Sequence, residues 1–487
     1  MNFSSYQQNF FDMIETGTGS ILLNAKAGSG KTTTIVEASN RLPRNSKVLF
    51  LAFNKNIVEE LQGRLASHVR CVTFNSCGWT AWRNFTGKRM INVSSGKTRQ
   101  IIRDNFSVQD QDLYLAFVNR MVAIAKSSGL TPKSTTEEWF NWMDHHNVQL
   151  GSEEANLDRG IFLAQKTLEE SIRISHQECD FDDQIYMPWL RGATFEKYDY
   201  IFIDEAQDTN KVQKDLLKRM LNPGGRLIAV GDPAQAIYGF RGSDANSMSL
   251  IARDFEAQEM PLSICYRCCK AVIREAQKWI PEIEASETAP EGKVDNLDTY
   301  SVSDFKTSDA VLCRKNAPLI EFAYGLIARR MPVNFVGRDI QEGLKNLVLN
   351  MKAKSLDDLE VKLENWLAKQ TEKLLKKDRE DQIEVLQDRL ACIQIFINNL
   401  PADKQTVNDL VRSMDELFSG DKGITLSSIH KAKGREFDRV FILDFHLMPL
   451  KSAKLPWMME QEKNLIYVSI TRAKYHLTYI LSDSWKN

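Results

Sequence analysis

The sequence predicts an α/β protein with two parallel-sheet domains, each interrupted by a helical insertion. Three observations lead to this fold class. Short apolar runs alternate with amphipathic helices, the hydrophobic period changes to 3.6 residues in two long stretches, and a glycine-rich turn follows the first apolar run. The length of 487 residues is enough for about three domains of ordinary size.

The first domain begins with alternating strands and helices. Its apolar runs are SILLNA (20–25), KVLFLAF (47–53) and VRCVTF (69–74), and the first two lead into the helical patterns TTTIVEASNRL and NIVEELQGRLA. Amphipathic helices then replace the strands between residues 87 and 190, and strands return with YDYIFID (198–204) and RLIAVGD (226–232). We therefore expect a first domain of residues 1–86 and 191–260, with a helical insertion at 87–190.

The second domain repeats this organisation. Its expected strands are AVLCR (310–314), VNFVG (333–337), ITLSSIH (424–430), RVFILDF (439–445) and HLTYIL (476–481). A second helical insertion is expected at 341–420, inside a domain of 261–340 and 421–487. The polar stretch KKDRED within that insertion fits either a turn or a solvated part of one long helix.

Composition excludes several classes of protein. With 43% hydrophobic and 26% charged residues, the chain is ordinary globular protein, and its longest apolar runs fall far short of the ~20 residues that span a bilayer. The start of the sequence has no basic segment followed by an apolar one, so we expect no signal peptide. A net charge of −1 taken alone argues against a nucleic-acid partner.

The eight cysteines are too sparse for a disulfide scaffold and fit a reducing cytosol. The cluster Cys265, Cys268 and Cys269 could be half of a metal site. A structural zinc or iron–sulfur site needs about four ligands, and no second pair completes it. We therefore interpret these residues as free thiols.

The turn after the first strand has the composition of a phosphate-binding loop. AKAGSGKT runs from Ala25 to Thr32 between a strand and a helix, where glycines let backbone N–H groups point at phosphate oxygens. Lys31 would reach the β and γ phosphates, and the Thr32 hydroxyl would bind Mg²⁺. Ala25 replaces the first glycine of the usual pattern, and a glycine-rich turn without a ligand is the alternative.

An acidic pair at the end of an apolar strand would complete such a site. In IFIDEAQD, Asp204 would be the Mg²⁺ partner and Glu205 would orient or deprotonate the attacking water. A solvated acidic turn explains this pattern equally well in isolation. Together with Lys31, it predicts an ATP-hydrolysing site.

At this point the sequence resembles the superfamily 1 DNA helicases of the UvrD/Rep/PcrA type over nearly its whole length. Six motifs occur in the family's order: AKAGSGKT, DEAQD, GDPAQAIYGFRG (231–242), CYR (265–267), ITLSSIHKAKGREFD (424–438) and EKNLIYVSITRAK (462–474). The placement of TFNS and FNK is similar to the branch that contains F-box DNA helicases and small phage or bacterial relatives. The resemblance implies two RecA-like P-loop motor domains.

The resemblance also implies roles for single residues at the nucleotide. The catalytic set would be Lys31, Glu205, Gln235, Arg267 and Arg472, with Gln235 as the γ-phosphate sensor and Arg472 as the arginine finger. The nucleotide-binding set would be Gln7, Gly28, Ser29, Gly30, Lys31, Thr32, Thr33, Tyr266 and Glu436, and Gln8 is an alternative to Gln7 as the adenine-reading glutamine. ATP would lie between the two domains. Without the resemblance, Arg472 would be a surface charge of a helix.

Single-stranded DNA is the partner that the resemblance implies. Its contacts would be Phe53, Asn54, Lys55, Thr73, Phe74, Asn75, Ser76, Tyr238, Phe240, Arg241 and His430. Core packing is the alternative for Phe53 and Phe74, and Asn75 stands where the family usually has histidine. Acidic helices elsewhere could offset basic residues along the DNA, which makes the net charge a poor guide to the partner.

The function implied is an ATP- and Mg²⁺-dependent helicase that moves along single-stranded DNA with 3′→5′ polarity and unwinds tailed duplexes. The alternative is a DNA-stimulated ATPase that displaces proteins or senses DNA without useful unwinding. The resemblance further implies a monomeric, cytoplasmic protein of a bacterium or phage. It gives no reason to expect a membrane contact, and the second insertion is too short to transfer the accessory-domain functions of larger members.

Overall fold

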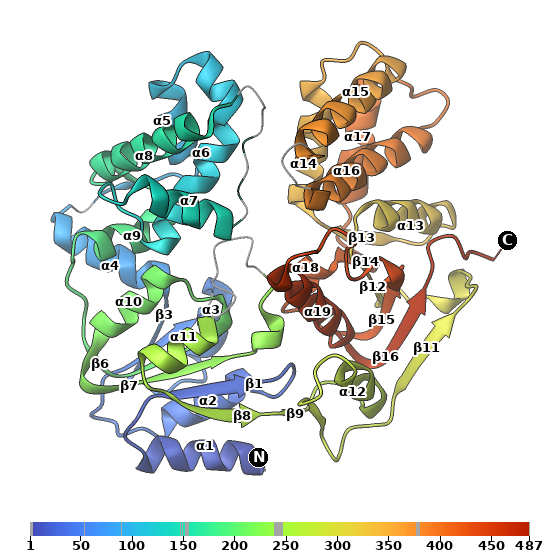
Figure 1. Cartoon of the computed structure of the whole chain (residues 1–487). Coiled ribbons are helices and arrows are strands. Elements are labelled where there is room, and N and C mark those ends of the chain that lie inside the picture. The colour runs from blue at the N-terminus through green and yellow to red at the C-terminus, as the bar shows by residue number, and fades with distance from the viewer. Residues whose placement is uncertain are drawn as a thin grey trace. The chain divides into compact units, whose positions relative to one another are not determined.

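The computed structural model describes residues 3–52, 54–88, 90–146, 148, 150, 155–237, 247–375 and 380–486. The chain forms two compact units, Met1–Ser263 and Ile264–Asn487, coloured from blue to green and from yellow to red in Figure 1. Among the described residues, no helix is both long enough and apolar enough to cross a bilayer.

The first unit is built on a parallel sheet of strand order β3-β2-β6-β7-β1-β8. Its strands are β1 (Ile21–Ala25), β2 (Val48–Ala52), β3 (Val69–Thr73), β6 (Tyr198–Ile203), β7 (Leu221–Gly231) and β8 (Gln258–Leu262). Every neighbouring pair is parallel, with Leu23 of β1 opposite Val230 of β7. The carboxyl ends of β1 and β6 therefore place the glycine-rich loop and the acidic pair on the same edge of one sheet.

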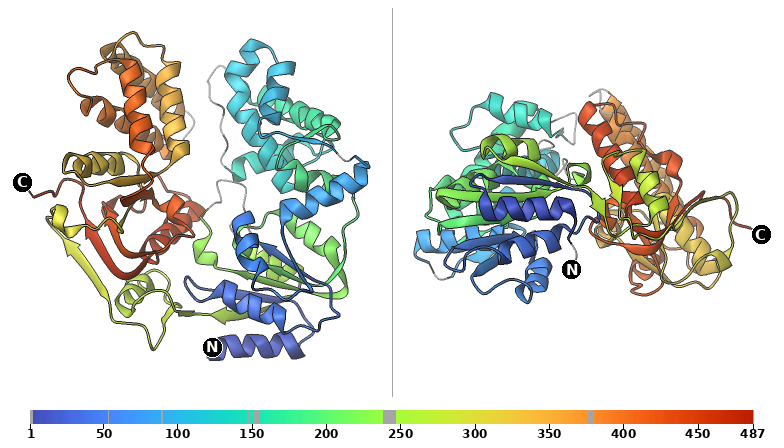
Figure 2. Two further views of the ribbon diagram at one scale, coloured as in Figure 1. Left: turned by 180° about the vertical axis from the view of Figure 1, so that it is seen from behind. Right: turned by 90° about the horizontal axis from the view of Figure 1, so that it is seen from below.

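Helices cover both faces of this sheet, because successive strand side chains point to opposite faces. Leu23, Phe50 and Phe202 pack on one face, under α1 (Ser5–Thr16), α2 (Lys31–Asn40) and α3 (Lys55–Gln62). Their chain neighbours, such as Leu22 and Ile203, pack on the other face, under α4 (Phe74–Thr86), α10 (Lys211–Met220) and α11 (Ser247–Asp254). Figure 2 shows both helical layers of this unit.

The first helical insertion has a hydrophobic core of its own. Its helices are α5 (Lys97–Asn105), α6 (Val108–Ser128), α7 (Thr136–His145), α8 (Leu157–Ile174) and α9 (Asp183–Leu190), joined by a short pair of strands, β4 (Asn92–Val93) and β5 (Glu178–Cys179). Phe117, Met121, Trp139 and Tyr186 are buried among these helices. The insertion is therefore a separate layer rather than a cover for the sheet.

The second unit repeats the parallel α/β plan, with strand order β11-β16-β15-β12-β14-β13. Its strands are β11 (Lys293–Leu297), β12 (Ala310–Cys313), β13 (Val333–Val336), β14 (Ile424–Ser428), β15 (Phe437–Leu443) and β16 (Ala473–Ile480), and all pairs are parallel. Helices α12 (Lys270–Gln277), α13 (Ala317–Ala328), α18 (Ile429–Ala432) and α19 (Pro456–Ile470) accompany the sheet. The predicted α/β class with two parallel sheets is confirmed.

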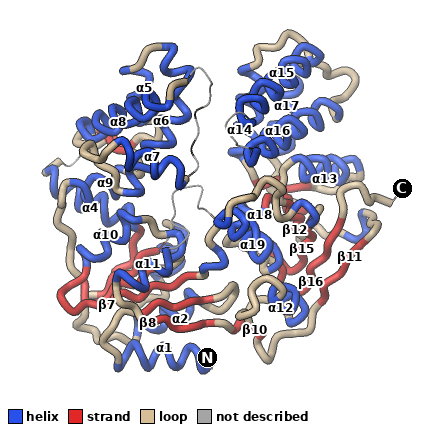
Figure 3. Tube along the Cα trace, viewed as in Figure 1, coloured by secondary structure: helices blue, strands red, loops and turns tan. Residues whose placement is uncertain are grey.

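The second helical insertion shares its core with the sheet of its unit. Its helices, α14 (Arg338–Asn350), α15 (Leu356–Leu375), α16 (Glu380–Asn398) and α17 (Val407–Phe418), form the group that Figure 3 draws beyond the end of the sheet. Leu359 and Ile393 of these helices belong to one buried cluster with Val311 of β12. Asp388 of α16 also accepts the backbone N–H groups of Asn316 and Ala317 at 3.0 and 2.9 Å, so it caps α13. Residues 376–379, the first part of KKDRED, lie outside the described residues.

Candidate nucleotide and DNA sites

The glycine-rich loop joins β1 to α2 and depends on two glycines in the left-handed region. Gly28 and Gly30 have φ angles of 68° and 78°, and Gly30 is the N-cap of α2. Residues with a side chain rarely adopt this backbone conformation, so glycine is required for the loop to turn into the helix. The loop thus presents backbone N–H groups at a helix N-terminus, the usual arrangement for binding phosphate.

Two polar side chains of this loop are buried without a hydrogen-bond partner among the described residues. They are the Ser29 hydroxyl and the Lys31 ammonium. A buried ammonium without a partner is costly, because burial removes its hydration. The loop is therefore suited to an anionic ligand that would supply the missing acceptors, which is the chemistry of a triphosphate.

The acidic pair lies where β6 ends. Glu205 has a φ of 54°, an uncommon left-handed conformation for a residue with a side chain, and a 3₁₀ turn, Ala206–Asp208, follows it. Burial raises the pKa of the Asp204 carboxyl to about 7, the charge of Glu205 adds to this rise, and Lys31 opposes it. A divalent cation beside Asp204 would favour its ionised form. The binding of Mg²⁺ by Asp204 and Thr32 stays a prediction.

The structure distinguishes the two candidate adenine-reading glutamines. The Gln7 side chain is buried and donates to the Thr34 hydroxyl of α2 at 2.8 Å, while its oxygen accepts the backbone N–H of Ser4. Gln8 instead bonds to Asp12 on the exposed surface of α1. The placement beside the phosphate loop favours Gln7, and its contact with adenine stays a prediction.

In the second unit, the residues assigned to the nucleotide form one charged cluster. The Arg267 guanidinium lies 2.6 Å from a Glu436 oxygen, and the Lys474 ammonium lies 2.8 Å from the other oxygen. Burial raises the pKa of the Glu436 carboxyl, but the hydrogen bond from Lys474 and the charge of Arg267 outweigh this effect and bring the pKa below its ordinary value. The neighbouring Tyr266 is 47% exposed, so its ring is accessible, and its contact with adenine stays a prediction.

Arg472 is not a surface charge, since it is only 1% exposed. Its guanidinium donates to the backbone carbonyls of Val468 and Arg435 at 3.0 and 2.9 Å. One of these bonds holds the guanidinium against Arg435, the residue that precedes Glu436 in the chain. The helix-surface alternative for Arg472 is therefore wrong.

The three clustered cysteines are buried free thiols that brace this region. The Cys268 thiol donates to the carbonyl of Thr471 at 3.6 Å, and the Cys269 thiol donates to that of Tyr475 at 3.4 Å. In the part of the chain that the structure describes, no group of three or more His, Cys, Asp or Glu side chains could hold a metal ion. Their bonds tie the segment after Tyr266 and Arg267 to the residues on both sides of Arg472.

The candidate DNA contacts of the first unit lie at the carboxyl ends of β2 and β3. Asn54 and Thr73 are the N-caps of α3 and α4, Lys55 begins α3 and is exposed, and Phe74 is half-buried. His430 belongs to α18 in the second unit. Phe53, Tyr238, Phe240 and Arg241 lie outside the described residues.

A cavity of about 180 Å³ is lined both by the first residues of α4, which are assigned to DNA, and by the acidic pair. Phe74 and Asn75 form one part of its wall, and Asp204, Glu205 and Asp208 form another. The same sheet edge thus carries residues assigned to DNA and residues assigned to ATP hydrolysis. Core packing explains only part of Phe74, because its ring is half-buried and reaches this cavity.

Asn75 connects this loop to the first helical insertion. Its amide nitrogen donates to the carbonyl of Phe181 at 2.8 Å and to the side chain of Gln184 at 3.1 Å. The Phe181 ring is 59% exposed beside it. Phe181 is a candidate base-stacking residue that the motifs did not reveal. The sequence offers one indication of an exposed ring here, because Phe181 stands alone among the acidic residues of DFDD.

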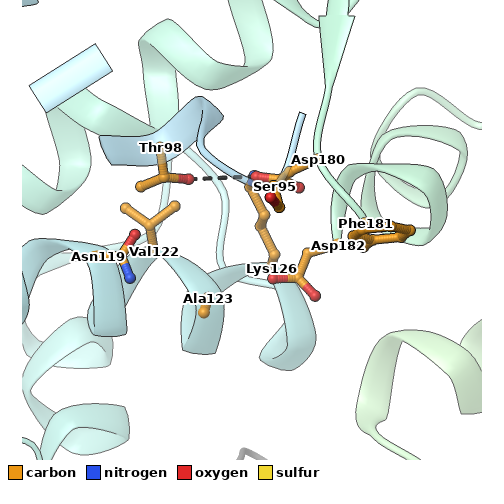
Figure 4. A pocket seen from close by; sticks show the side chains of 9 residues that line it. All are labelled: Ser95, Thr98, Asn119, Val122, Ala123, Lys126, Asp180, Phe181 and Asp182. Atoms are coloured by element: carbon orange, nitrogen blue, oxygen red, sulfur yellow. Dashed lines mark hydrogen bonds and ion pairs between the residues drawn. The ribbon is translucent and has the colours of Figure 1, made fainter. Parts of the chain in front are cut away.

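A buried ionic cluster fixes the segment that carries Phe181. Lys97 is 2.5 Å from Asp183, and Lys126 is 2.6 Å from Asp180 and 2.8 Å from Asp183. Figure 4 shows Lys126 and Asp180 in the wall of a cavity of about 170 Å³, with Thr98 donating to Asp180 and Phe181 at the rim. Two ammonium groups and two carboxylates balance one another in these ion pairs, and desolvation by the surrounding protein together with the charge of Asp180 raises the pKa of the neighbouring Asp182 carboxyl to about 6.

The fold and the loop define the class of this protein, a P-loop nucleotide-binding protein of two parallel α/β units. Comparison with known families identifies two matching domain models. The model of the UvrD/REP helicase N-terminal domain matches residues 7–256, and that of the UvrD-like helicase C-terminal domain matches residues 338–484. The chain belongs to the UvrD/REP helicase family.

Three relatives illustrate the range of this similarity. F-box DNA helicase protein 1 of Schizosaccharomyces pombe is 24% identical, over 98% of this chain and 57% of its own length. ATP-dependent DNA helicase Rep of Buchnera aphidicola is 27% identical, over 58% of this chain and 44% of its own length. ATP-dependent DNA helicase PcrA of Staphylococcus epidermidis is 24% identical, over 96% of this chain and 82% of its own length. The chain thus spans about half the length of the first two.

Proposed function

We propose that this protein is an ATP-dependent DNA helicase that translocates on single-stranded DNA in the 3′→5′ direction and unwinds duplexes with single-stranded tails. The observation that carries the proposal is the cavity whose wall includes both Phe74 and Asn75 and the pair Asp204 and Glu205. The relatives in this family are named as ATP-dependent DNA helicases, which is why we propose DNA and ATP as ligands. The shared cavity gives a physical route by which bound DNA could affect ATP hydrolysis. We further propose that the protein works as a monomer.

In the proposed reaction, Lys31 and the loop N–H groups bind the β and γ phosphates, and Glu205 orients the attacking water. Thr32 and Asp204 would hold Mg²⁺, which neutralises phosphate charge when it is bound. Arg267 exchanges its Glu436 partner for the γ phosphate, and Lys474 keeps Glu436 paired during the exchange. Arg472, already held by backbone carbonyls, stabilises the charge of the transition state.

The deciding experiment measures strand displacement on duplexes with a 3′ tail, a 5′ tail or blunt ends, together with ATP hydrolysis. We expect single-stranded DNA to stimulate hydrolysis and ATP to drive displacement from the 3′-tailed substrate only. Stimulated hydrolysis without displacement on any substrate would contradict the helicase assignment and leave a DNA-stimulated ATPase. Displacement from the 5′ tail alone would contradict the polarity.

Phe181→Ala is expected to weaken single-stranded DNA binding about ten-fold, because base–aromatic stacking contributes roughly 1–3 kcal/mol per base. The backbone carbonyl that accepts from Asn75 is unchanged in this variant. Fluorescence anisotropy with a labelled oligonucleotide measures the effect. Phe162→Ala is the control, since Phe162 is another exposed phenylalanine of the first helical insertion. Equal affinities of the two variants would remove Phe181 from the DNA site.

A further inference from the structure

A chain of buried side-chain hydrogen bonds runs from the acidic pair to the turn that carries Gln235. The amide nitrogen of Gln207 donates to a Glu205 carboxylate oxygen, and the amide oxygen of Gln207 accepts the backbone N–H of Asp232 at 3.1 Å. Asp232 in turn accepts the Gln235 amide at 2.7 Å. Gln207 and Asp232 are 1% and 0% exposed. Gln207 therefore links the carboxylate assigned to water activation with the residue assigned to γ-phosphate sensing.

The two turns at the ends of this series of hydrogen bonds are each held by a side chain that bonds to their backbone groups. The turn after Glu205 is fixed by the Ser247 hydroxyl, which bonds to the carbonyls of Ala206 and Thr209 at 3.1 and 2.7 Å. The other turn is fixed by Asp232, whose carboxylate also accepts the N–H of Ala234. Both turns are thus fixed in place, and the Gln207 side chain is hydrogen-bonded to each of them.

The position of Gln207 requires an amide and requires a glycine beside it. An amide is both a donor and an acceptor, and Gln207 uses one function toward Glu205 and the other toward Asp232. A carboxylate there would lose the donor and face Glu205 with a like charge. A β-carbon at Gly231 would lie 2.4 Å from the Gln207 amide oxygen, so the close approach depends on glycine at the end of β7.

We propose that Gln207 is a positioning residue that couples the orientation of the Glu205 carboxylate to the turn of Asp232 and Gln235, and thereby conveys the DNA-bound state to ATP hydrolysis. This inference rests on the proposed function, since it presumes that DNA stimulates hydrolysis. It adds a residue that contacts neither reactant in the proposed reaction.

The test compares Gln207→Met, which loses both hydrogen bonds, and Gln207→Glu, which keeps only the acceptor. With saturating single-stranded DNA, kcat is expected to fall at least ten-fold in both variants, because small misplacements of a reacting group have large effects on rate. The DNA-free rate should fall no more than about three-fold, because without DNA the chain has no bound state to convey and Glu205 is already away from its best position. The KM for ATP, the DNA affinity and the melting temperature should stay near wild-type values. A merely structural role would lower the melting temperature or both rates together.

Gln111→Met is the matched control, because Gln111 also donates from a half-buried amide, to the carbonyls of Arg103 and Phe106 in the first helical insertion. It should behave like the wild type. If Gln207→Met does not fold, Gln207→Glu carries the test, since it preserves the shape of the side chain.

A double-mutant cycle with Gln235→Ala tests the chain itself. Since both changes interrupt one path, Gln207→Met should have little further effect on DNA stimulation once Gln235 is replaced. Independent, multiplicative effects would overturn the proposal, and so would normal DNA stimulation in a folded Gln207→Met protein. Absence of DNA-stimulated hydrolysis in the wild type would instead contradict the proposed function.

Discussion

Lys31→Ala is expected to abolish ATP turnover, with a loss of kcat of at least 10²–10³-fold, the effect of removing one well-placed transition-state donor. The structure gives the physical reason, because the Lys31 ammonium is buried at the mouth of the loop without a hydrogen-bond partner among the described residues. Its charge acts on the neighbouring Asp204, but it makes no hydrogen bond that holds the fold of the described residues together. The variant should therefore remain folded while steady-state hydrolysis is lost with and without DNA.

Lys47→Ala is a suitable control, since the Lys47 side chain is exposed on the same unit and its ion pair with Glu196 is long, at 3.8 Å. Its hydrolysis rate should equal that of the wild type. Wild-type turnover in Lys31→Ala would contradict the assignment of the phosphate loop. Nucleotide binding measured with a fluorescent analogue separates a loss of affinity from a loss of the chemical step.

Asp183→Ala is expected to produce the largest loss of stability, about 3–5 kcal/mol, the typical effect of breaking a buried ion pair on one side. Asp183 contacts both Lys97 and Lys126, and its removal takes away the carboxylate that balances the buried ammonium group of Lys97, which keeps its bond to the carbonyl of Ser171. For a unit of this size, such a loss lowers the melting temperature by roughly 10 °C. Differential scanning calorimetry measures the transition.

Glu170→Ala provides the comparison, because the Glu170–Arg173 pair lies at the surface of α8, where an ion pair contributes little. Asp183→Leu combined with Lys97→Met should be more stable than Asp183→Ala, since it removes a charge of each sign from the interior. If Asp183→Ala were no less stable than Glu170→Ala, the cluster would have no structural role.

The central strands of both sheets were predictable because they are buried on both faces and read as continuous apolar runs. The edge strands β8 and β11 were not predicted. Each has a neighbour on one side only, and QEMPL and KVDNL lack an apolar run. Helix α9 was also missed, since it is short and contains Pro188. Tertiary packing, rather than local pattern, forms these elements.

The candidate site also has a part that the local sequence predicts and a part that depends on tertiary packing. Lys31, Glu205 and Arg472 could be assigned to the site because they occupy fixed positions in sequence motifs. The contacts around them could not be predicted, since a motif does not show which side chains meet. Lys474 bonds across 38 residues to Glu436, and Gln207 bonds across 25 residues to Asp232. The placement of Asn75 against Phe181 likewise depends on a distance of 106 residues along the chain.

The shared core of the second helical insertion limits how this protein could be shortened. Excising α14–α17 would uncover Val311 and its neighbours on the sheet, and it would remove the carboxylate that caps α13. The remainder would be an aggregation-prone fragment instead of a minimal motor. The first helical insertion, which has a separate core, is the better place to graft a foreign domain or to change length during evolution.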